Sequence, residues 1–294
     1  LSPQCNCRCL MCGMWRKPAE RISYEDAKRV IDFLLKNRFL IIYFTGGEPT
    51  LHPQLPELVN YAHRAGMVTT MTTNGTVSET VLKRLKESGL QGVSISLDHF
   101  KPDVCEAIRG VKDIMEAQIQ AIQHAKALGL KPYALAYLNP QILHDGVVNL
   151  INYTNKVLNV PWGFCFPTEA WNSYALNYEN QTIQELREAM RSILALKIHG
   201  NGMIVNTVSY IMDTLRFLDG RPTVNKCRSG QDVVYIDWNG DVYPCFLKDK
   251  MFNALSDEPC FRLMNCDQCL TNCFREPSLL GRLTLPLIVR ELSH

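Results

Sequence analysis

The sequence predicts an α/β fold with a parallel sheet, followed by a small cysteine-rich module that contains a β-hairpin. Short apolar runs alternate with amphipathic segments, and an Asn-Gly pair joins two short β runs near the end of the chain. Alternating strands and helices favour a parallel sheet with right-handed crossovers. The expected strands are residues 40–44, 67–72, 92–97, 132–137 and 163–166.

The segments between these runs have the caps and the periodicity of helices. Ser23 can cap a helix whose apolar side chains recur at helical spacing over residues 27–35. Ser78 can cap another helix, which Gly89 ends. Further helices are expected at residues 55–62, 111–128, 147–158, 182–197 and 206–218.

Turn residues and polar side chains follow the expected strands at one end. Gly46–Pro49, Thr72–Gly75 and Ser94–Asp98 end three of them, and Asn139 follows the next. Parallel barrels place their active sites at the carboxyl ends of their strands. We therefore expect these residues to surround a single ligand-filled mouth.

The composition is that of an ordinary globular enzyme. The chain has 294 residues, and 46% of them are hydrophobic. The net charge of +2 indicates neither nucleic acid nor an anionic membrane as a partner. No apolar run is long enough to span a bilayer, and no secretory segment is visible. The twelve cysteines gather mainly near the two ends, which favours metal binding in a reducing cytoplasm over disulfides.

Three cysteines near the start have the spacing C-x3-C-x2-C. They are Cys5, Cys9 and Cys12, and Cys7 lies between the first two. Three thiolates this close can hold three irons of a cubane cluster and leave the fourth iron without a protein ligand. A zinc site is the alternative, because closely spaced cysteines also suit tetrahedral zinc.

With Gly46-Gly47-Glu48-Pro49 after the first expected strand, this cysteine motif resembles that of the radical S-adenosylmethionine (radical SAM) superfamily. The resemblance implies a partial (β/α)6 barrel over residues 1–170, with a sixth strand expected before Cys5 and the N-terminus trimmed. It also implies that Cys5, Cys9 and Cys12 hold a 4Fe-4S cluster whose open iron is chelated by SAM. Cys7 is interpreted as a non-ligand.

The same resemblance assigns SAM-binding roles to seven further residues. Gly46, Gly47 and Pro49 would shape the loop, and the Glu48 carboxylate would meet the methionine ammonium. Asn74 and Ser96 would contact the ribose or the carboxylate of SAM, and Arg109 would pair with that carboxylate. A turn at Asn74, a plain strand position at Ser96 and a solvated surface charge at Arg109 are the alternatives. Asp98 could serve the substrate or cap a turn.

The second group of cysteines begins at residue 227. Asn239-Gly240 is a strong hairpin signal and would place Cys227 and Cys245 at the open ends of a two-stranded hairpin. The region, predicted as residues 227–294 after a helical connector at 171–226, resembles the SPASM/twitch extension of radical SAM enzymes. This resemblance implies an auxiliary 4Fe-4S cluster, and the ligand candidates are Cys227, Cys245, Cys266 and Cys269, with Cys273 as a substitute for either of the last two.

A zinc site remains the alternative in this region, because C-x2-C suits both metals. Cys260 is the weakest candidate, since it can serve as a small apolar residue. Cys105 and Cys165 are interpreted as structural.

The function implied by the resemblance is reductive cleavage of SAM to a 5′-deoxyadenosyl radical, which abstracts hydrogen from a substrate C–H bond. The substrate is expected to be a small polar metabolite, and the alternative is a ribosomally made peptide that the enzyme matures. An electron donor such as a flavodoxin or a ferredoxin is implied as a partner. The rival class is a non-catalytic iron–sulfur electron carrier or a zinc-stabilised binding module. A carrier, however, has no need of an under-ligated cluster.

Overall fold

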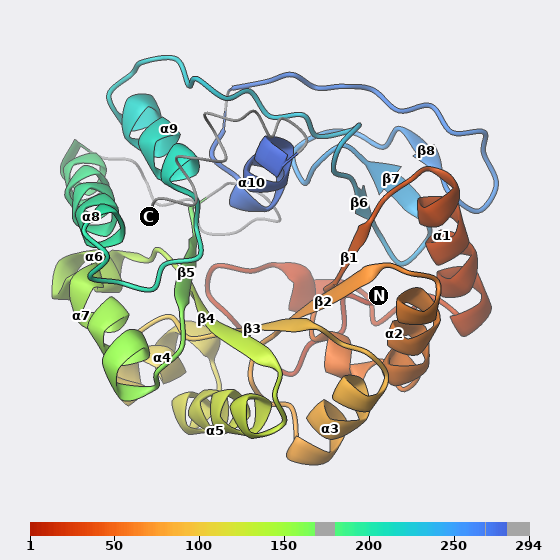
Figure 1. The fold of residues 1–294 in the computed structure, drawn as a ribbon, viewed down its shortest axis with the longest axis horizontal. Coiled ribbons are helices and arrows are strands. Elements are labelled where there is room, and N and C mark those ends of the chain that lie inside the picture. The colour runs from red at the N-terminus through yellow and green to blue at the C-terminus, as the bar shows by residue number, and fades with distance from the viewer. Residues whose placement is uncertain (168–179, 268, 281–294) are drawn as a thin grey trace.

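The computed structural model describes residues 1–167, 180–267 and 269–280. Five parallel strands form its main sheet in the order β1-β2-β3-β4-β5, so each strand pairs with its neighbours in sequence (Figure 1). The predicted α/β fold is confirmed, and each expected run overlaps one strand to within one residue at its ends. The strands are β1 (Ile41–Phe44), β2 (Val68–Thr73), β3 (Gly92–Ser96), β4 (Lys131–Tyr137) and β5 (Trp162–Cys165).

The helices lie on the outside of the curved sheet (Figure 1). Ser23 Oγ accepts the Asp26 N–H at 3.0 Å and Ser78 Oγ accepts the Val81 N–H at 3.4 Å, as their sequence positions predict. The helices around the barrel are α1 (Tyr24–Lys36), α2 (Leu55–Arg64), α3 (Glu79–Glu87), α4 (Pro102–Arg109), α5 (Ile114–Ala127), α6 (Pro140–Asp145) and α7 (Val147–Asn152). The segment Tyr153–Val157 continues α7 as a π-helical turn.

Alternate strand residues bury the sheet against these helices. Met71, Val93, Ile95 and Phe164 have no accessible surface. Each such side chain contributes about 1.5–3 kcal/mol relative to an exposed one. The residues between them face the inside of the curve and are mostly less buried, as the alternating pattern of β4 shows. One face of the sheet therefore carries the core, and the other is open to a ligand.

Residues 1–13 contain no strand, so the sixth strand stays a prediction. Part of the predicted connector, residues 171–179, lies outside the described residues, as do residues 281–294 of the predicted C-terminal module. The described part of the connector contains the two expected helices, α8 (Asn180–Ile198) and α9 (Val208–Leu218). None of the described helices is long and apolar enough to cross a membrane.

The C-terminal module contains the predicted hairpin, because β6 and β7 pair antiparallel, and a third strand, β8, pairs with β7 to complete a small sheet. The third strand also packs on the barrel, since the Phe252 ring lies 5.8 Å from that of Phe33 on α1. Gly240 makes the predicted turn with a φ of 80°. The strands are β6 (Tyr235–Ile236), β7 (Asp241–Tyr243) and β8 (Phe252–Asn253), and α10 (Asn272–Leu280) follows.

Candidate functional site

The N-terminal cysteine loop lies against the glycines that follow β1. The Gly47 N–H donates to Ser2 O at 2.7 Å and the Glu48 N–H donates to Gln4 O at 2.8 Å. A Cβ on Gly46 would overlap the backbone of Ser2, and one on Gly47 would overlap the carbonyl oxygen of Gln4. In this structure, the two glycines thus admit the chain that carries the cysteines.

Glu48 is buried and makes its hydrogen bonds inside the protein. Its Oε1 accepts from Thr50 Oγ1 at 2.6 Å and from Thr73 Oγ1 at 2.9 Å, and its Oε2 accepts the Asn74 N–H at 2.7 Å. Burial raises the pKa of this carboxyl, and the hydrogen bonds oppose that rise. Glu48 therefore ties the loop after β1 to the end of β2. Pro49, which is also buried, begins the short 3-10 turn Pro49–Leu51.

Asn74 connects this edge of the sheet to the first cysteine. Its side-chain amide donates to Asn6 Oδ1 at 2.7 Å and lies 3.8 Å from Cys5 Sγ. Its Oδ1 accepts the Thr76 N–H at 2.9 Å, which fixes the orientation of the amide. Asn74 is thus both a turn residue and a neighbour of the cysteine loop. Ser96, the last residue of β3, is buried on the same face as Ser94.

The cysteine loop favours thiolates at two of its predicted ligands. A hydrogen bond with the buried Cys7 thiol is the largest influence that lowers the pKa of Cys5 to about 7 and that of Cys9 to about 6. Burial raises the pKa of Cys12. The thiolate is the form that binds iron. Three thiol donors in one loop are the ligand type that iron–sulfur clusters take.

In the part of the chain that the structure describes, no three His, Cys, Asp or Glu side chains converge as a group able to hold a metal ion. A cubane bonds each thiolate to a different iron, so its ligands lie further apart than those of a single ion.

Arg109, the last residue of α4, contacts the cysteine loop at Cys9. Its Nε donates to Asp98 Oδ2 at 2.5 Å, and its NH1 lies 3.7 Å from Cys9 Sγ. The alternative of a solvated surface charge is wrong, because only 11% of the Arg109 side chain is accessible. The role of Asp98 is one that sequence reasoning did not find. The signal for it was weak, since Asp98 and Arg109 are eleven residues apart and meet only when the end of α4 returns to the loop after β3.

A cluster of hydroxyl groups lies on the inner face of the sheet, and sequence reasoning missed it. Tyr43 OH lies 2.7 Å from Ser94 Oγ and 3.4 Å from Tyr133 OH, and it also contacts Thr72. Thr72 Oγ1 lies 2.5 Å from Ser94 Oγ. The Tyr43 side chain remains 45% accessible. The strand alternation alone places these four residues on one face, so the signal was present in the sequence.

The structure brings Cys227 and Cys266 of the C-terminal group together. The Cys227 N–H donates to Cys266 O at 2.8 Å, and a hydrogen bond with the Cys266 thiol lowers the pKa of Cys227 to about 5. Cys227 therefore pairs with Cys266 and does not end the hairpin, which corrects that expectation. The paired residues lie in a separate cluster with Cys245 and Phe274.

The remaining cysteines differ in their surroundings. Cys269 Sγ lies 3.6 Å from Thr271 Oγ1 and interacts electrostatically with Cys245 and Cys266. Cys273 and Cys260 are exposed. Cys105 is buried and donates to His99 O at 3.2 Å, and Cys165 ends β5.

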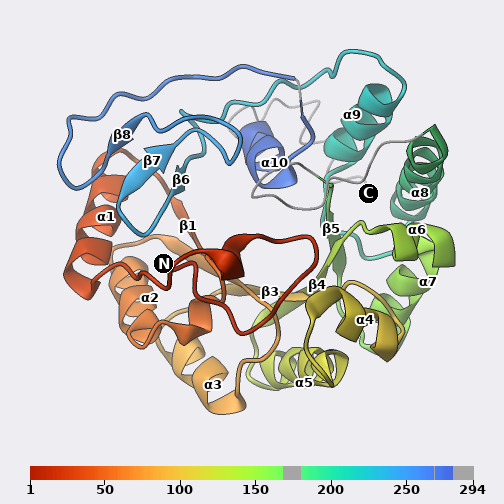
Figure 2. The same ribbon diagram turned by 180° about the vertical axis from the view of Figure 1, so that it is seen from behind.

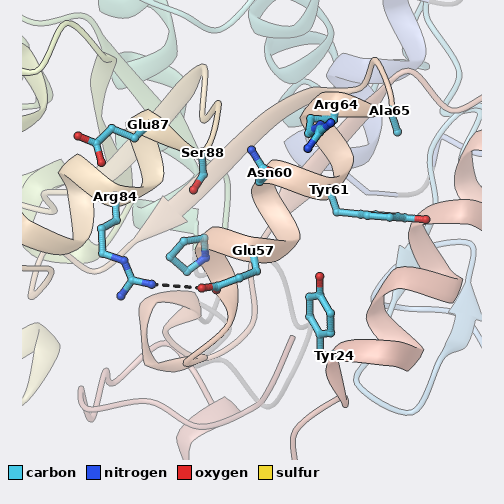
Figure 3. A pocket seen from close by; sticks show the side chains of 10 residues that line it. Tyr24, Glu57, Asn60, Tyr61, Arg64, Ala65, Arg84, Glu87 and Ser88 are labelled. Carbon is cyan, nitrogen blue, oxygen red and sulfur yellow. Dashed lines mark hydrogen bonds and ion pairs between the residues drawn. The ribbon is translucent and has the colours of Figure 1, made fainter.

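A surface hollow between α2 and α3 is a different feature. Arg84 and Glu57 form an ion pair at 3.2 Å across it, and Tyr24, Tyr61 and Arg64 also line it (Figure 3). None of the predicted cofactor or metal residues lines this hollow. The candidate site is therefore the edge where the cysteine loop meets Glu48, Asn74 and Arg109. Figure 2 shows the N-terminal segment that carries this loop, coloured red, in front of the main sheet.

Comparisons with known proteins identify the family of the chain. Residues 1–146 match the model of the Radical SAM superfamily. The chain is 30% identical over 212 residues to a protein named Fe-coproporphyrin III synthase from Methanosarcina barkeri, a match that covers 69% of this chain and 52% of the relative. It is 29% identical over 159 residues to a probable GTP 3′,8-cyclase from Sulfolobus acidocaldarius, with 53% of this chain and 50% of the relative covered. The chain thus spans about half the length of these two curated relatives.

The fold is also similar to that of a solved structure, SuiB of Streptococcus suis bound to the precursor peptide SuiA. The TM-score is 0.68 and the sequence identity 17%, and the match covers 96% of this chain and 64% of that chain. The parallel sheet with its outer helices is a partial radical SAM barrel. The family model and the fold agree with the cysteine motif, and the chain belongs to the radical SAM superfamily.

Proposed function

We propose that this protein is a radical SAM enzyme that abstracts hydrogen from a C–H bond of a small polar metabolite. In this proposal, Cys5, Cys9 and Cys12 hold a 4Fe-4S cluster and SAM binds at its open iron. When both are bound, they supply the 5′-deoxyadenosyl radical by reductive cleavage of SAM. The observation that carries the proposal is the convergence of Asn74 and Arg109 on the sulfurs of Cys5 and Cys9 at the carboxyl edge of the sheet.

The residues around the loop would orient these groups and exclude water. Glu48 holds the backbone of Asn74, and Gly46 and Gly47 let the loop approach. An ion pair between Glu48 and the methionine ammonium stays a prediction. Such a pair would have to share the carboxylate with the donors from Thr50, Thr73 and Asn74. Ser96 and Asn74 remain candidates for contacts with SAM.

The side chains on the inner face of the sheet favour a substrate that presents an uncharged polar group there. The hydroxyls of Tyr43, Thr72, Ser94 and Tyr133 offer hydrogen bonds without charge. Within the five described strands, the alternation leaves Lys131, at the amino end of β4, as the charged residue of this face. A nucleoside triphosphate, as the name of the cyclase relative suggests, would call for more cations here.

A peptide is the second candidate substrate, because the similar SuiB structure holds a precursor peptide. Backbone amides would also suit the neutral hydroxyls of the inner face.

The C-terminal cysteines would hold an auxiliary 4Fe-4S cluster. The shared cluster of Cys227, Cys245 and Cys266 supports this part of the proposal, as do the electrostatic interactions of Cys269 with Cys245 and Cys266. Cys273 remains the substitute ligand. The auxiliary cluster would take an electron from the substrate radical, relay one, or bind substrate. A small redox protein such as a flavodoxin or a ferredoxin would donate the electron for SAM cleavage.

The test is metal analysis with spectroscopy of the anaerobically reconstituted protein. We expect iron and sulfide in equal amounts, an EPR signal of the reduced protein that changes when SAM is added, and formation of 5′-deoxyadenosine with dithionite. An EPR signal that ignores SAM would instead indicate a non-catalytic electron carrier. Zinc without sulfide would indicate a zinc-stabilised binding module.

A further inference from the structure

The ion pair between Arg109 and Asp98 lies next to Cys9, one of the predicted cluster ligands. Arg109 Nε donates to Asp98 Oδ2 at 2.5 Å, while NH1 of the same guanidinium lies 3.7 Å from Cys9 Sγ. The Asp98 side chain is fully buried and that of Arg109 is 11% accessible. The pair thus places a positive charge next to the sulfur and a negative charge behind it, both shielded from water.

Both charges are fixed in place. Asp98 Oδ1 accepts the Tyr137 N–H at 2.9 Å, which anchors the carboxylate to the end of β4. Arg109 O accepts the Arg8 N–H at 2.8 Å, and Ile108 O accepts the Leu10 N–H at 2.9 Å, so the backbone of the cysteine loop is bonded to the end of α4. The distance between the guanidinium and Cys9 is therefore set by the fold.

These contacts leave Arg109 little freedom for its predicted role. Its Nε is committed to Asp98, and a bidentate pair with the carboxylate of SAM would need the guanidinium to turn away from Cys9. Net charge and hydrogen bonds to the sulfurs are what tune the reduction potential of an iron–sulfur cluster.

We propose that the Arg109–Asp98 pair sets the reduction potential of the cluster held by Cys5, Cys9 and Cys12, an inference that rests on the proposed function. Arg109 donates to the Cys9 thiolate and stabilises the additional negative charge of the reduced cluster, so it makes reduction easier. Asp98 holds the guanidinium in position and offsets part of its charge. Arg109 is thus a tuning residue for the cluster rather than a ligand of SAM.

The test compares three variants with the wild-type protein after anaerobic reconstitution. They are Arg109→Gln, Asp98→Asn and the double variant, and Arg84→Gln is the matched control because it removes one positive charge from the surface pair with Glu57. The midpoint potential is measured by an EPR-monitored titration without SAM. Matched samples with SAM identify the signal that belongs to the first cluster. Iron content and SAM affinity are measured in parallel.

We expect the midpoint potential to be lowest in Arg109→Gln and highest in Asp98→Asn. The double variant should lie between Arg109→Gln and the wild type, because Arg109 is the closer of the two charges to Cys9. The midpoint potential of Arg109→Gln should lie at least about 59 mV below that of the wild type, which corresponds to a tenfold change in the one-electron equilibrium. Arg84→Gln should match the wild type.

An unchanged potential in Arg109→Gln with full iron content would overturn the inference, and so would weaker SAM binding without a change in potential. Arg109→Gln could fail to hold iron because Asp98 is left unpaired. In that case the double variant is the test, and an unchanged midpoint potential in it, with full iron content, would overturn the inference. A wild-type protein without any SAM-responsive signal would overturn the proposed function, and the inference with it. A normal signal whose potential ignores these substitutions would overturn the inference alone.

Discussion

Glu48 Oε2 accepts the backbone N–H of Asn74 at 2.7 Å, and this bond joins the loop after β1 to the loop after β2. The side chain of the same Asn74 lies 3.8 Å from Cys5 Sγ. One buried carboxylate therefore determines where the amide next to the cysteine loop is placed.

Replacing Glu48 with Gln should destabilise the protein. The carboxylate now accepts hydrogen bonds from Thr50, Thr73 and Asn74. The NH2 group of the new amide would face at least one of these donors, and an unsatisfied buried donor costs about 1–3 kcal/mol. Chemical denaturation of the protein without iron measures this loss. Glu57→Gln is the control, because the exposed pair of Glu57 with Arg84 contributes little.

The same variant tests the predicted contact with SAM. We expect Glu48→Gln to keep the first cluster and to bind SAM more weakly, since an amide is a poorer acceptor for an ammonium group. Equal SAM affinity in both proteins, measured after reconstitution, would show that Glu48 only organises the loop.

Replacing Gly47 with Ala should displace the cysteine loop. A Cβ at this position overlaps the carbonyl oxygens of Pro3 and Gln4, so the bonds from the backbone of residues 47 and 48 to the loop would be lost. We expect the iron content to fall while the far-ultraviolet circular dichroism stays unchanged. Gly202→Ala is the control, because a Cβ there meets its nearest neighbour at 3.4 Å. Normal iron binding in Gly47→Ala would show that the loop can shift without cost to the cluster.

Replacing Cys9 with Ala should abolish formation of 5′-deoxyadenosine while the fold survives, because the main sheet does not depend on the cysteine loop. Thermal unfolding and product analysis measure the two effects. The control is Cys105→Ala, since Cys105 is also buried but bonds to His99 O. Undiminished formation of 5′-deoxyadenosine by Cys9→Ala would show that the cysteine motif is not part of the catalytic site.

The alternation of apolar runs was sufficient to predict the fold, because each run had to be buried against amphipathic helices. Ser23 and Ser78 were recognisable as caps for the same local reason. β8 was missed because two residues carry no strand pattern. It pairs with β7, and Phe252 packs on Phe33, a contact between distant parts of the sequence.

The candidate site could be predicted only in part. Local motifs indicated the cysteines, Glu48 and Asn74, since each lies in a recognisable turn or spacing. The pairing of Arg109 with Asp98 depends on how α4 returns to the loop after β3, and no short pattern encodes that. The hydroxyl cluster depends on the register between strands, such as Thr72 opposite Ser94 and Ser94 opposite Tyr133.

Glu276 on α10 should make the stability of the protein depend on pH. Its Oε1 accepts the Thr207 N–H at 2.7 Å and its Oε2 accepts from Asn206 at 2.9 Å. Burial raises the pKa of Glu276 from 4.5 to about 7. The folded protein therefore holds this proton more tightly than the unfolded chain does. The associated stability is present below pH 4.5 and is lost as the pH rises to about 7.

Glu276→Gln removes this titration. Between pH 5 and pH 7.5, the free energy of unfolding of the wild type should decline relative to that of the variant by at most about 3 kcal/mol. Glu258→Gln, an exposed position in the same module, should follow the wild type. A constant difference between the wild type and Glu276→Gln across this range would contradict the raised pKa.

The last prediction concerns the C-terminal cysteines. If Cys227, Cys245, Cys266 and Cys269 hold a second cubane, the protein should carry about eight irons, four per cluster. Changing Cys227 and Cys245 together to Ala should remove about half of the iron and leave the SAM-responsive EPR signal in place. The module should also lose solubility, because its short strands have little apolar surface of their own. Cys260→Ala is the control, since Cys260 is exposed. About four irons and one zinc in the wild type would show that this region is a structural zinc site.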